Sequence, residues 1–189
     1  MSLLYGDGFA SNTALPSGSS YAFCSLFKKS LVVSARNLIL AATSLKIYCY
    51  RAMFSWCTTL VAPPQLPATT LTNGCYWYMF EQCGIMKAPE LPATTLVNEC
   101  YGHMFEGCAL LNTIICRAYD GFSSNNPMVD WVKGVNGEGT YVKSSQRPYS
   151  NYPKGNNGIP TGWVWMDDIL VYEPHVEFDG ETIELLCDT

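Results

Sequence analysis

The chain has 189 residues, of which 48% are hydrophobic and 14% are charged, and its formal net charge is −5. This length suits one domain with an ample core, and the hydrophobic content excludes a disordered chain. The low charge and its negative sign exclude a nucleic-acid binder that works through phosphate contacts. Nine cysteines are the unusual feature, because an odd number cannot all pair within one chain.

The N-terminal segment carries no visible targeting signal. Residues 1–7 lack both the basic and the apolar regions of a signal peptide. The longest apolar stretches, near 38–42 and 169–172, are much shorter than the ~20 residues that a membrane helix needs. We therefore expect no membrane insertion, and either a chain that is not secreted by this route or a piece of a longer one.

An internal repeat occupies the next part of the chain. Leu-Pro-Ala-Thr-Thr-Leu at 66–71 recurs unchanged at 91–96, 25 residues later, and a degenerate copy at 40–45 precedes it by 26 residues. Each copy is followed at a fixed distance by Cys-Tyr-x-x-Met-Phe-x-x-Cys, and residues 21–27 resemble an eroded unit. Three clear units with atypical ends are what a stacked array requires.

Each unit predicts a strand, a turn and a helix. Leu71, Cys75, Met79 and Cys83 are four residues apart, which places them on one side of a helix. The Thr-Thr pair before them would cap that helix, and Gly84 or Gly107 would help to end it. Short apolar pieces then follow and are cut off by prolines, so that any strand is short. These pieces are 60–62, 86–88 and 111–113.

The repeated unit resembles the BspA-like leucine-rich repeats of Bacteroides surface proteins and their phages. The resemblance covers residues 3–165 and includes 130–135, 139–143 and 158–163 near the end of the array. It implies adhesion and protein–protein binding without catalytic residues. The expected fold is therefore α/β, a short right-handed leucine-rich-repeat solenoid with strand-turn-helix coils of about 25 residues.

The C-terminal third has a different residue pattern, which divides the chain into a solenoid at 1–118 and a turn-rich β cap at 119–189. Residues 140–142 follow a turn and read as a strand. Residues 176–185 alternate around Asp179-Gly180, which predicts a hairpin. We expect this small cap to close the end of the solenoid, with a contact to a further domain or partner as the alternative.

The cysteines recur in phase, so each set is expected to form a ladder along the stack. Two cysteines of one unit are eight residues apart, or about 12 Å on a helix, which is too far for a disulfide. Buried free thiols are favoured over disulfides between units, and a zinc site is disfavoured because the chain has no close-spaced pair. The two ladders are Cys49, Cys75 and Cys100, and Cys57, Cys83 and Cys108.

Histidines and carboxylates offer little catalytic chemistry. His103 follows Cys100 by three residues, but Ala52 and Tyr78 stand at its place in the other units, which indicates a surface position rather than a Cys/His hydrolase pair.

Eight of the sixteen carboxylates lie in 163–189, where there is no Lys or Arg. Residues 1–162 therefore carry a net charge of 11 − 8 = +3. Glu177 and Asp179 leave calcium as a weak alternative to a solvated acidic edge.

Positions that vary between units on a fixed framework are the candidate binding residues. Large aromatic side chains at solvent-facing positions are costly unless they make contacts, although packing against neighbouring units is the simpler explanation. The candidates are Trp56, Trp77, Tyr78, Lys87, Glu90 and Asn112.

These residues predict a non-enzymatic adhesion module without a metal ion or a cofactor. The expected partner is a protein or glycan on a host or bacterial surface, and the place is extracellular, at the cell surface or on a virion. A phage fibre or decoration subunit, contacting neighbouring virion subunits, is the alternative.

Overall fold

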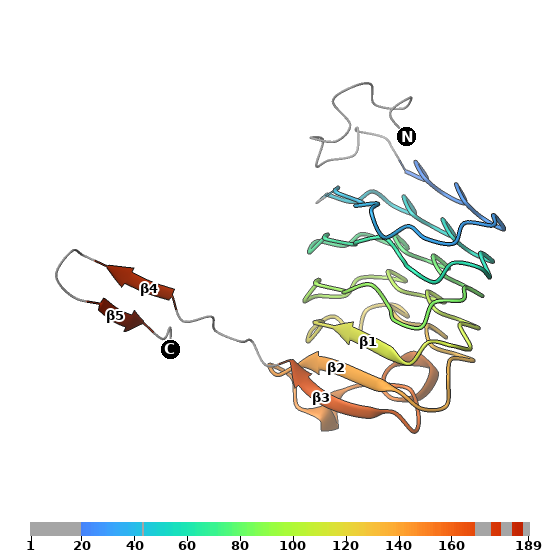
Figure 1. Cartoon of the computed structure of the whole chain (residues 1–189). Coiled ribbons are helices and arrows are strands. Elements are labelled where there is room, and N and C mark those ends of the chain that lie inside the picture. Colours follow the sequence, from blue (N-terminus) through green and yellow to red (C-terminus); the bar gives the residue numbers. More distant parts are fainter. Residues whose placement is uncertain (1–19, 43, 169–174, 179–182, 187–189) are drawn as a thin grey trace.

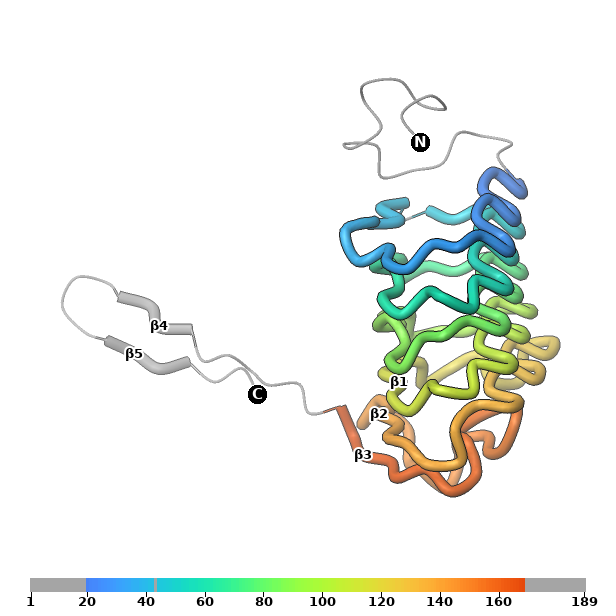
Figure 2. Tube along the Cα trace, turned by 45° about the vertical axis from the view of Figure 1, so that its right-hand side comes forward, coloured from blue at the N-terminus to red at the C-terminus, as the bar shows by residue number. Residues whose placement is uncertain are grey.

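The computed structural model describes residues 20–42, 44–168, 175–178 and 183–186. Between residues 20 and 168 the chain winds into coils that stack on one another (Figures 1 and 2). Backbone hydrogen bonds join equivalent positions of neighbouring coils: the N–H of Tyr50 donates to the carbonyl of Cys75 at 3.0 Å, and that of Tyr76 to the carbonyl of Cys100 at 3.1 Å. The repeat length in the sequence is therefore the length of one coil.

The helices expected in each coil are absent from the part of the chain that the structure describes. The helical elements found there are two short 3-10 turns, η2 (Tyr149–Asn151) and η3 (Gly155–Asn157). The prediction of an α/β solenoid with strand-turn-helix coils is therefore wrong. The Thr-Thr pairs consequently cap no helix, and Thr70 instead forms a β-bridge with Ser44 of the preceding coil.

Successive tight turns take the place of each helix. Tyr48, Ala52 and Trp56 have φ angles of 55°, 52° and 63°, so that a left-handed residue recurs every four positions. Such a residue interrupts a right-handed helix and reverses the local direction of the chain. The same pattern recurs in the other coils, and we call 20–29, 47–56, 73–82, 98–107 and 125–134 the turn segments.

Hydrogen bonds within the turn segments alternate between two kinds of partner. The N–H of Cys49 donates to the carbonyl of Lys46, three residues back, whereas the next N–H donates to the following coil. Every backbone donor from Tyr48 to Cys57 is used in this way. Stacking thus satisfies the polar groups that a helix would have satisfied internally.

A small parallel sheet continues the stack at its C-terminal end. It has the order β1 (Thr113–Cys116), β2 (Thr140–Ser144) and β3 (Val164–Asp168). Tyr141 of β2 pairs with Ile114 on one side and with Trp165 on the other. The strand predicted at 140–142 is confirmed, whereas the short apolar pieces at 60–62 and 86–88 form isolated bridges, because prolines end them.

A separate antiparallel pair follows, made of β4 (His175–Phe178) and β5 (Ile183–Leu186). Phe178 pairs with Ile183, which confirms the hairpin predicted around Asp179-Gly180, although its turn lies outside the described residues. The side chains of Glu177 and Asp179, the weak calcium candidates, also lie outside them.

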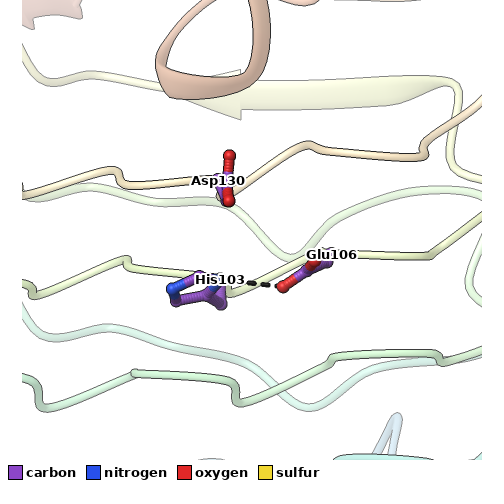
Figure 3. A group of neighbouring side chains, drawn as sticks. All are labelled: His103, Glu106 and Asp130. Carbon is purple, nitrogen blue, oxygen red and sulfur yellow. Dashed lines mark hydrogen bonds and ion pairs between the residues drawn. The ribbon is translucent and has the colours of Figure 1, made fainter.

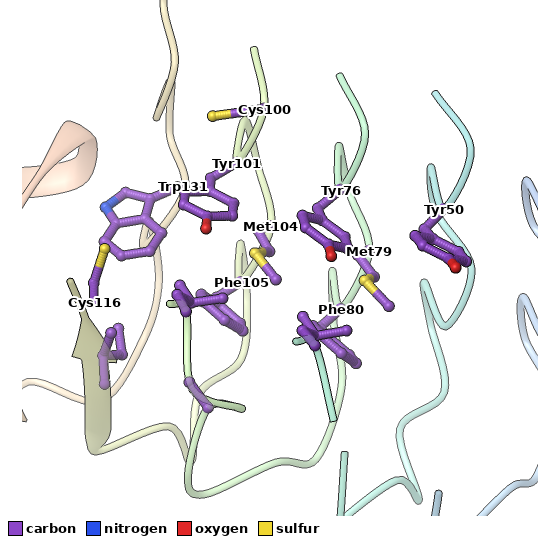
Figure 4. Packing of buried hydrophobic residues seen from close by; sticks show 14 of the residues in the cluster. Tyr50, Tyr76, Met79, Phe80, Cys100, Tyr101, Met104, Phe105, Cys116 and Trp131 are labelled. Carbon is purple, nitrogen blue, oxygen red and sulfur yellow. The ribbon is translucent and has the colours of Figure 1, made fainter. Parts of the chain in front are cut away.

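The core contains two aromatic columns that run along the stack, beside buried methionine and cysteine side chains (Figure 4). Neighbouring rings lie parallel, with centroids 5.8 Å apart for Tyr50–Tyr76 and 5.8 Å apart for Phe80–Phe105. Each such pair stabilises the fold by about 0.5–1.5 kcal/mol beyond the burial of its area. Both columns meet at the fully buried Trp131. The columns are Phe23, Tyr50, Tyr76 and Tyr101, and Phe27, Phe54, Phe80 and Phe105.

Candidate functional site

The turn segments also bring aromatic side chains together on their outer side. Within each group of four residues, the two core residues follow the left-handed one, so the left-handed residue and the fourth residue face away from the core, although small ones such as Ala52 and Ser55 are covered by neighbouring coils. Residues at these positions in neighbouring coils form a partly exposed cluster, which we call the aromatic surface. It comprises Tyr21, Tyr48, Arg51, Trp77, Tyr78 and His103.

Ring contacts run through the aromatic surface without a gap. Trp77 stacks on Tyr48 with centroids 5.5 Å apart and on Tyr78 with centroids 5.6 Å apart. Tyr78 in turn covers the imidazole of His103 at 4.4 Å and an interplanar angle of 9°. The guanidinium of Arg51 lies 5.3 Å from the centroid of Trp77, within the range of a cation–π contact. The rings therefore hold one another in fixed orientations.

Two tyrosine hydroxyls of this surface are hydrogen-bond donors at neutral pH. Partial burial, followed by the charge of Glu99, raises the pKa of Tyr48, and its hydroxyl donates to Glu99 Oε2 at 3.3 Å. Burial and the charge of Glu106 similarly raise the pKa of Tyr78. The surface thus combines apolar ring area, protonated hydroxyls and one guanidinium.

Of the residues expected to bind, Trp77 and Tyr78 lie together at the centre of the aromatic surface. Trp56, which is 46% exposed, occupies a different position of the turn segment, where its N–H donates to the carbonyl of Glu81. The sequence interpretation missed Tyr48 and Arg51. Aligning the turn segments position by position would have placed Arg51 at the position equivalent to Trp77, whereas Tyr48 aligns with Gly74 and reaches Trp77 only in the folded structure.

Lys87 and Glu90 lie elsewhere, in a groove of about 650 Å³ formed by the proline-rich corners of two coils. Arg36 and several prolines complete its lining. Asn112 is half-buried, and its Oδ1 accepts a hydrogen bond from Thr113 Oγ1 at 3.0 Å. The predicted binding residues are therefore dispersed: Trp77 and Tyr78 lie in the aromatic surface, Lys87 and Glu90 in the groove, and Trp56 and Asn112 in neither.

All six ladder cysteines are buried and free. Several of their thiols bond to the backbone of adjacent coils: Cys83 Sγ donates to the carbonyl of Phe54 at 3.0 Å and Cys108 Sγ to that of Phe80 at 2.9 Å. Burial raises the pKa of Cys49 to about 11 and that of Cys108 to about 12. The ladder cysteines fill small positions between the coils, and Cys49 and Cys108 stay protonated at neutral pH.

The structure does not assemble Cys100 and His103 into a nucleophile and a base. Cys100 Sγ lies in the core, 3.8 Å from the carbonyl of Pro127, and burial raises its pKa to about 12. His103 Nδ1 instead lies 2.8 Å from Glu106 Oε2. A thiol in this environment provides little thiolate at neutral pH.

His103 belongs to a polar cluster at the edge of the aromatic surface (Figure 3). Glu106 and Asp130 are its other potential metal-ligating members. Lys133 Nζ lies 3.2 Å from Glu106 Oε1 and 3.3 Å from Asp130 Oδ2. The cluster thus couples one imidazole, two carboxylates and one ammonium.

Comparisons with models of known protein families, with curated protein sequences and with solved structures find no match. Within the described residues, no helix has the length and apolar content needed to cross a bilayer. Chemical evidence on function therefore comes from the arrangement of the side chains themselves.

Proposed function

We propose that this protein is a non-enzymatic binding module whose aromatic surface contacts a protein partner at a cell or virion surface. The observation that carries this proposal is the continuous, partly exposed contact of Tyr48, Arg51, Trp77 and Tyr78. Tyrosine, tryptophan and arginine are the residue types that dominate binding energy at protein interfaces. The coils hold these side chains on fixed backbone, so that little conformational entropy is lost on binding.

The orientation of the rings favours a protein over a glycan. A sugar binds aromatic side chains by laying its C–H groups on an open ring face. Here Tyr78 lies against His103 at 4.4 Å, and Trp77 is stacked on both Tyr48 and Tyr78. The ring faces are used within the protein, and mainly edges, hydroxyls and the guanidinium remain for a partner.

The carboxylates around this surface indicate the charge of the partner. Glu99 lies beside Tyr48, and the charges of Glu81 and Glu106 act on Tyr78. Arg51 is the cation in contact with Tyr48 and Trp77. A partner with basic or hydrogen-bond-donating side chains around an apolar centre would complement this arrangement.

A double substitution, Trp77→Ala with Tyr78→Ala, tests the proposal. Other coils already accept small residues at these places, because Ala52 is equivalent to Tyr78 and Gly102 to Trp77. We expect binding to surface-displayed host proteins to weaken by at least about 2 kcal/mol, with a modest loss of thermal stability from the stacking contacts that are removed. Leu110→Ala, an exposed apolar residue elsewhere, is the matched control.

Equal binding by the wild type and the double variant would contradict the proposal. A glycan array measured with the same variants separates the two partner classes. Loss of glycan binding in the double variant would assign the surface to sugars instead.

A further inference from the structure

We propose that His103, Glu106 and Asp130 bind a divalent transition-metal ion of the Zn²⁺, Ni²⁺ and Co²⁺ class, a property beyond the binding function proposed above. One ligand atom from each side chain can be chosen so that all three lie within 4.8 Å of one another. His103 Nδ1 and Glu106 Oε2 are already 2.8 Å apart. Figure 3 shows the three side chains gathered on two neighbouring coils.

The turn segments place these ligands with little freedom. His103 and Asp130 occupy the same position in adjacent coils, with φ angles of 54° and 46°, and the N–H of His103 donates to the carbonyl of Val129 at 2.8 Å. Glu106 follows His103 by three residues and lies on the same outer side. Tyr78 stacks on the imidazole and restrains its plane. The donor set is therefore largely formed before a metal ion arrives.

The chemistry of the donors selects the class of ion. An imidazole nitrogen suits borderline transition metals, whereas Ca²⁺ and Mg²⁺ prefer oxygen ligands alone. Two carboxylates balance the charge of a divalent cation, and three protein ligands leave coordination positions for water.

Lys133 competes with the metal ion for the same carboxylates. Its ammonium bridges Glu106 Oε1 and Asp130 Oδ2, at 3.2 Å and 3.3 Å. The Lys133 side chain is 51% exposed, so it can turn outward when a metal ion binds. Metal affinity should therefore rise when this lysine loses its charge.

Titration of the full chain with Co²⁺, followed by absorption, and with Ni²⁺, followed by calorimetry, tests the proposal. Three variants are compared with the wild type: His103→Asn, Lys133→Gln, and Glu138→Gln as an exposed acidic control. Asparagine tolerates the left-handed conformation of position 103, so the fold should survive. Thermal melting without metal verifies this point.

We expect one bound ion per chain, at least about tenfold weaker binding by His103→Asn, and tighter binding by Lys133→Gln. The Glu138→Gln variant should bind as the wild type does. Absence of binding, or binding that His103→Asn leaves unchanged, would overturn the proposal. A thiolate-to-Co²⁺ charge-transfer band would also overturn it, because the ion would then lie on cysteine.

Discussion

Tyr48 and Glu99 are joined across an entire coil, since the hydroxyl of Tyr48 donates to Oε2 of Glu99, 51 residues further along the chain, at 3.3 Å. The position between them in the stack is Gly74, which has a φ of 59°. A Cβ atom there would overlap the ring of Tyr48. Gly74 thus provides both the left-handed conformation and the space through which Tyr48 reaches Glu99.

Gly74→Ala should therefore destabilise the fold for two separable reasons. The left-handed conformation costs a residue with a Cβ about 1–2 kcal/mol, and displacement of the Tyr48 ring adds about 1–3 kcal/mol. Chemical denaturation with the folded and unfolded states in equilibrium measures the sum.

Two glycines with open surroundings provide the controls for this experiment. Gly155 has a φ of 72° and no atom within 4 Å of a built Cβ, so Gly155→Ala should show the conformational cost alone. Gly137 also has open space, and its substitution should change little. Equal losses in the free energy of unfolding for Gly74→Ala and Gly155→Ala would show that the Tyr48 ring does not need the space that Gly74 leaves.

Lys143 is a buried ammonium whose counter-ion is Asp167. The lysine side chain is 2% exposed; it donates to Asp167 and to the carbonyls of Ser144 and Arg147, the latter at 2.8 Å. Asp167→Asn leaves this buried cation without a carboxylate and should cost about 2–4 kcal/mol in the free energy of unfolding.

Asp130→Asn is the matched comparison, because it removes a carboxylate from the exposed Lys133. Solvent already screens that pair, so this variant should unfold at nearly the wild-type denaturant concentration. Similar midpoints for the two variants would contradict a structural role for the Lys143–Asp167 pair.

The buried thiols predict a loss of stability at alkaline pH. In the unfolded chain a cysteine loses its proton near its ordinary pKa of 9.0, whereas burial raises the pKa of folded Cys49 to about 11 and that of Cys100 to about 12. The folded state then holds protons that the unfolded state has released. The stabilisation that these two buried thiols provide is fully present below pH 9.0. It is lost as pH rises toward about 11 for Cys49 and about 12 for Cys100.

Denaturation midpoints measured from neutral pH upward check this expectation. Cys49→Ala combined with Cys100→Ala should reduce the slope between pH 9.0 and about 11, whatever its effect on stability at neutral pH. A slope that is unchanged in the double variant would assign the pH dependence to other groups.

The sequence predicts the length of the coil but not its conformation. Identical motifs 25 residues apart reappear as hydrogen bonds between residues such as Tyr50 and Cys75. The spacing of four at Leu71, Cys75 and Met79 is compatible with a helix, yet four residues of a helix turn about 40° past a full turn at each such step. A strict period of four fits repeated turns better.

The turns cannot be recognised from the residue types, because few of the left-handed positions carry glycine. Gly74, Gly107 and Gly134 do, but Tyr78, Gln82 and Trp56 have no sequence preference for a positive φ. Their conformation is imposed by hydrogen bonds to the next coil, such as that from Tyr78 N–H to the carbonyl of Gly102 at 3.0 Å. Such pairing is visible only once the coils are stacked.

Only part of the candidate site could be predicted, because the sequence shows which residues vary but not how the coils place them. Trp77 and Tyr78 stand out as large residues at variable positions of the repeat, without any knowledge of the conformation. Asp130 meets His103 because these two left-handed residues align in adjacent coils, and Tyr48 meets Trp77 through the space that Gly74 leaves open. A helical coil would have directed these side chains differently.

The backbone φ angles of Tyr78 and its neighbours, obtained by solution NMR, test the central claim most directly. The account predicts positive φ at Gly74, Tyr78 and Gln82, with negative values at the core residues between them. Uninterrupted negative, helical φ angles from Cys75 to Cys83 would contradict it, and would restore the helix that the repeat first indicated.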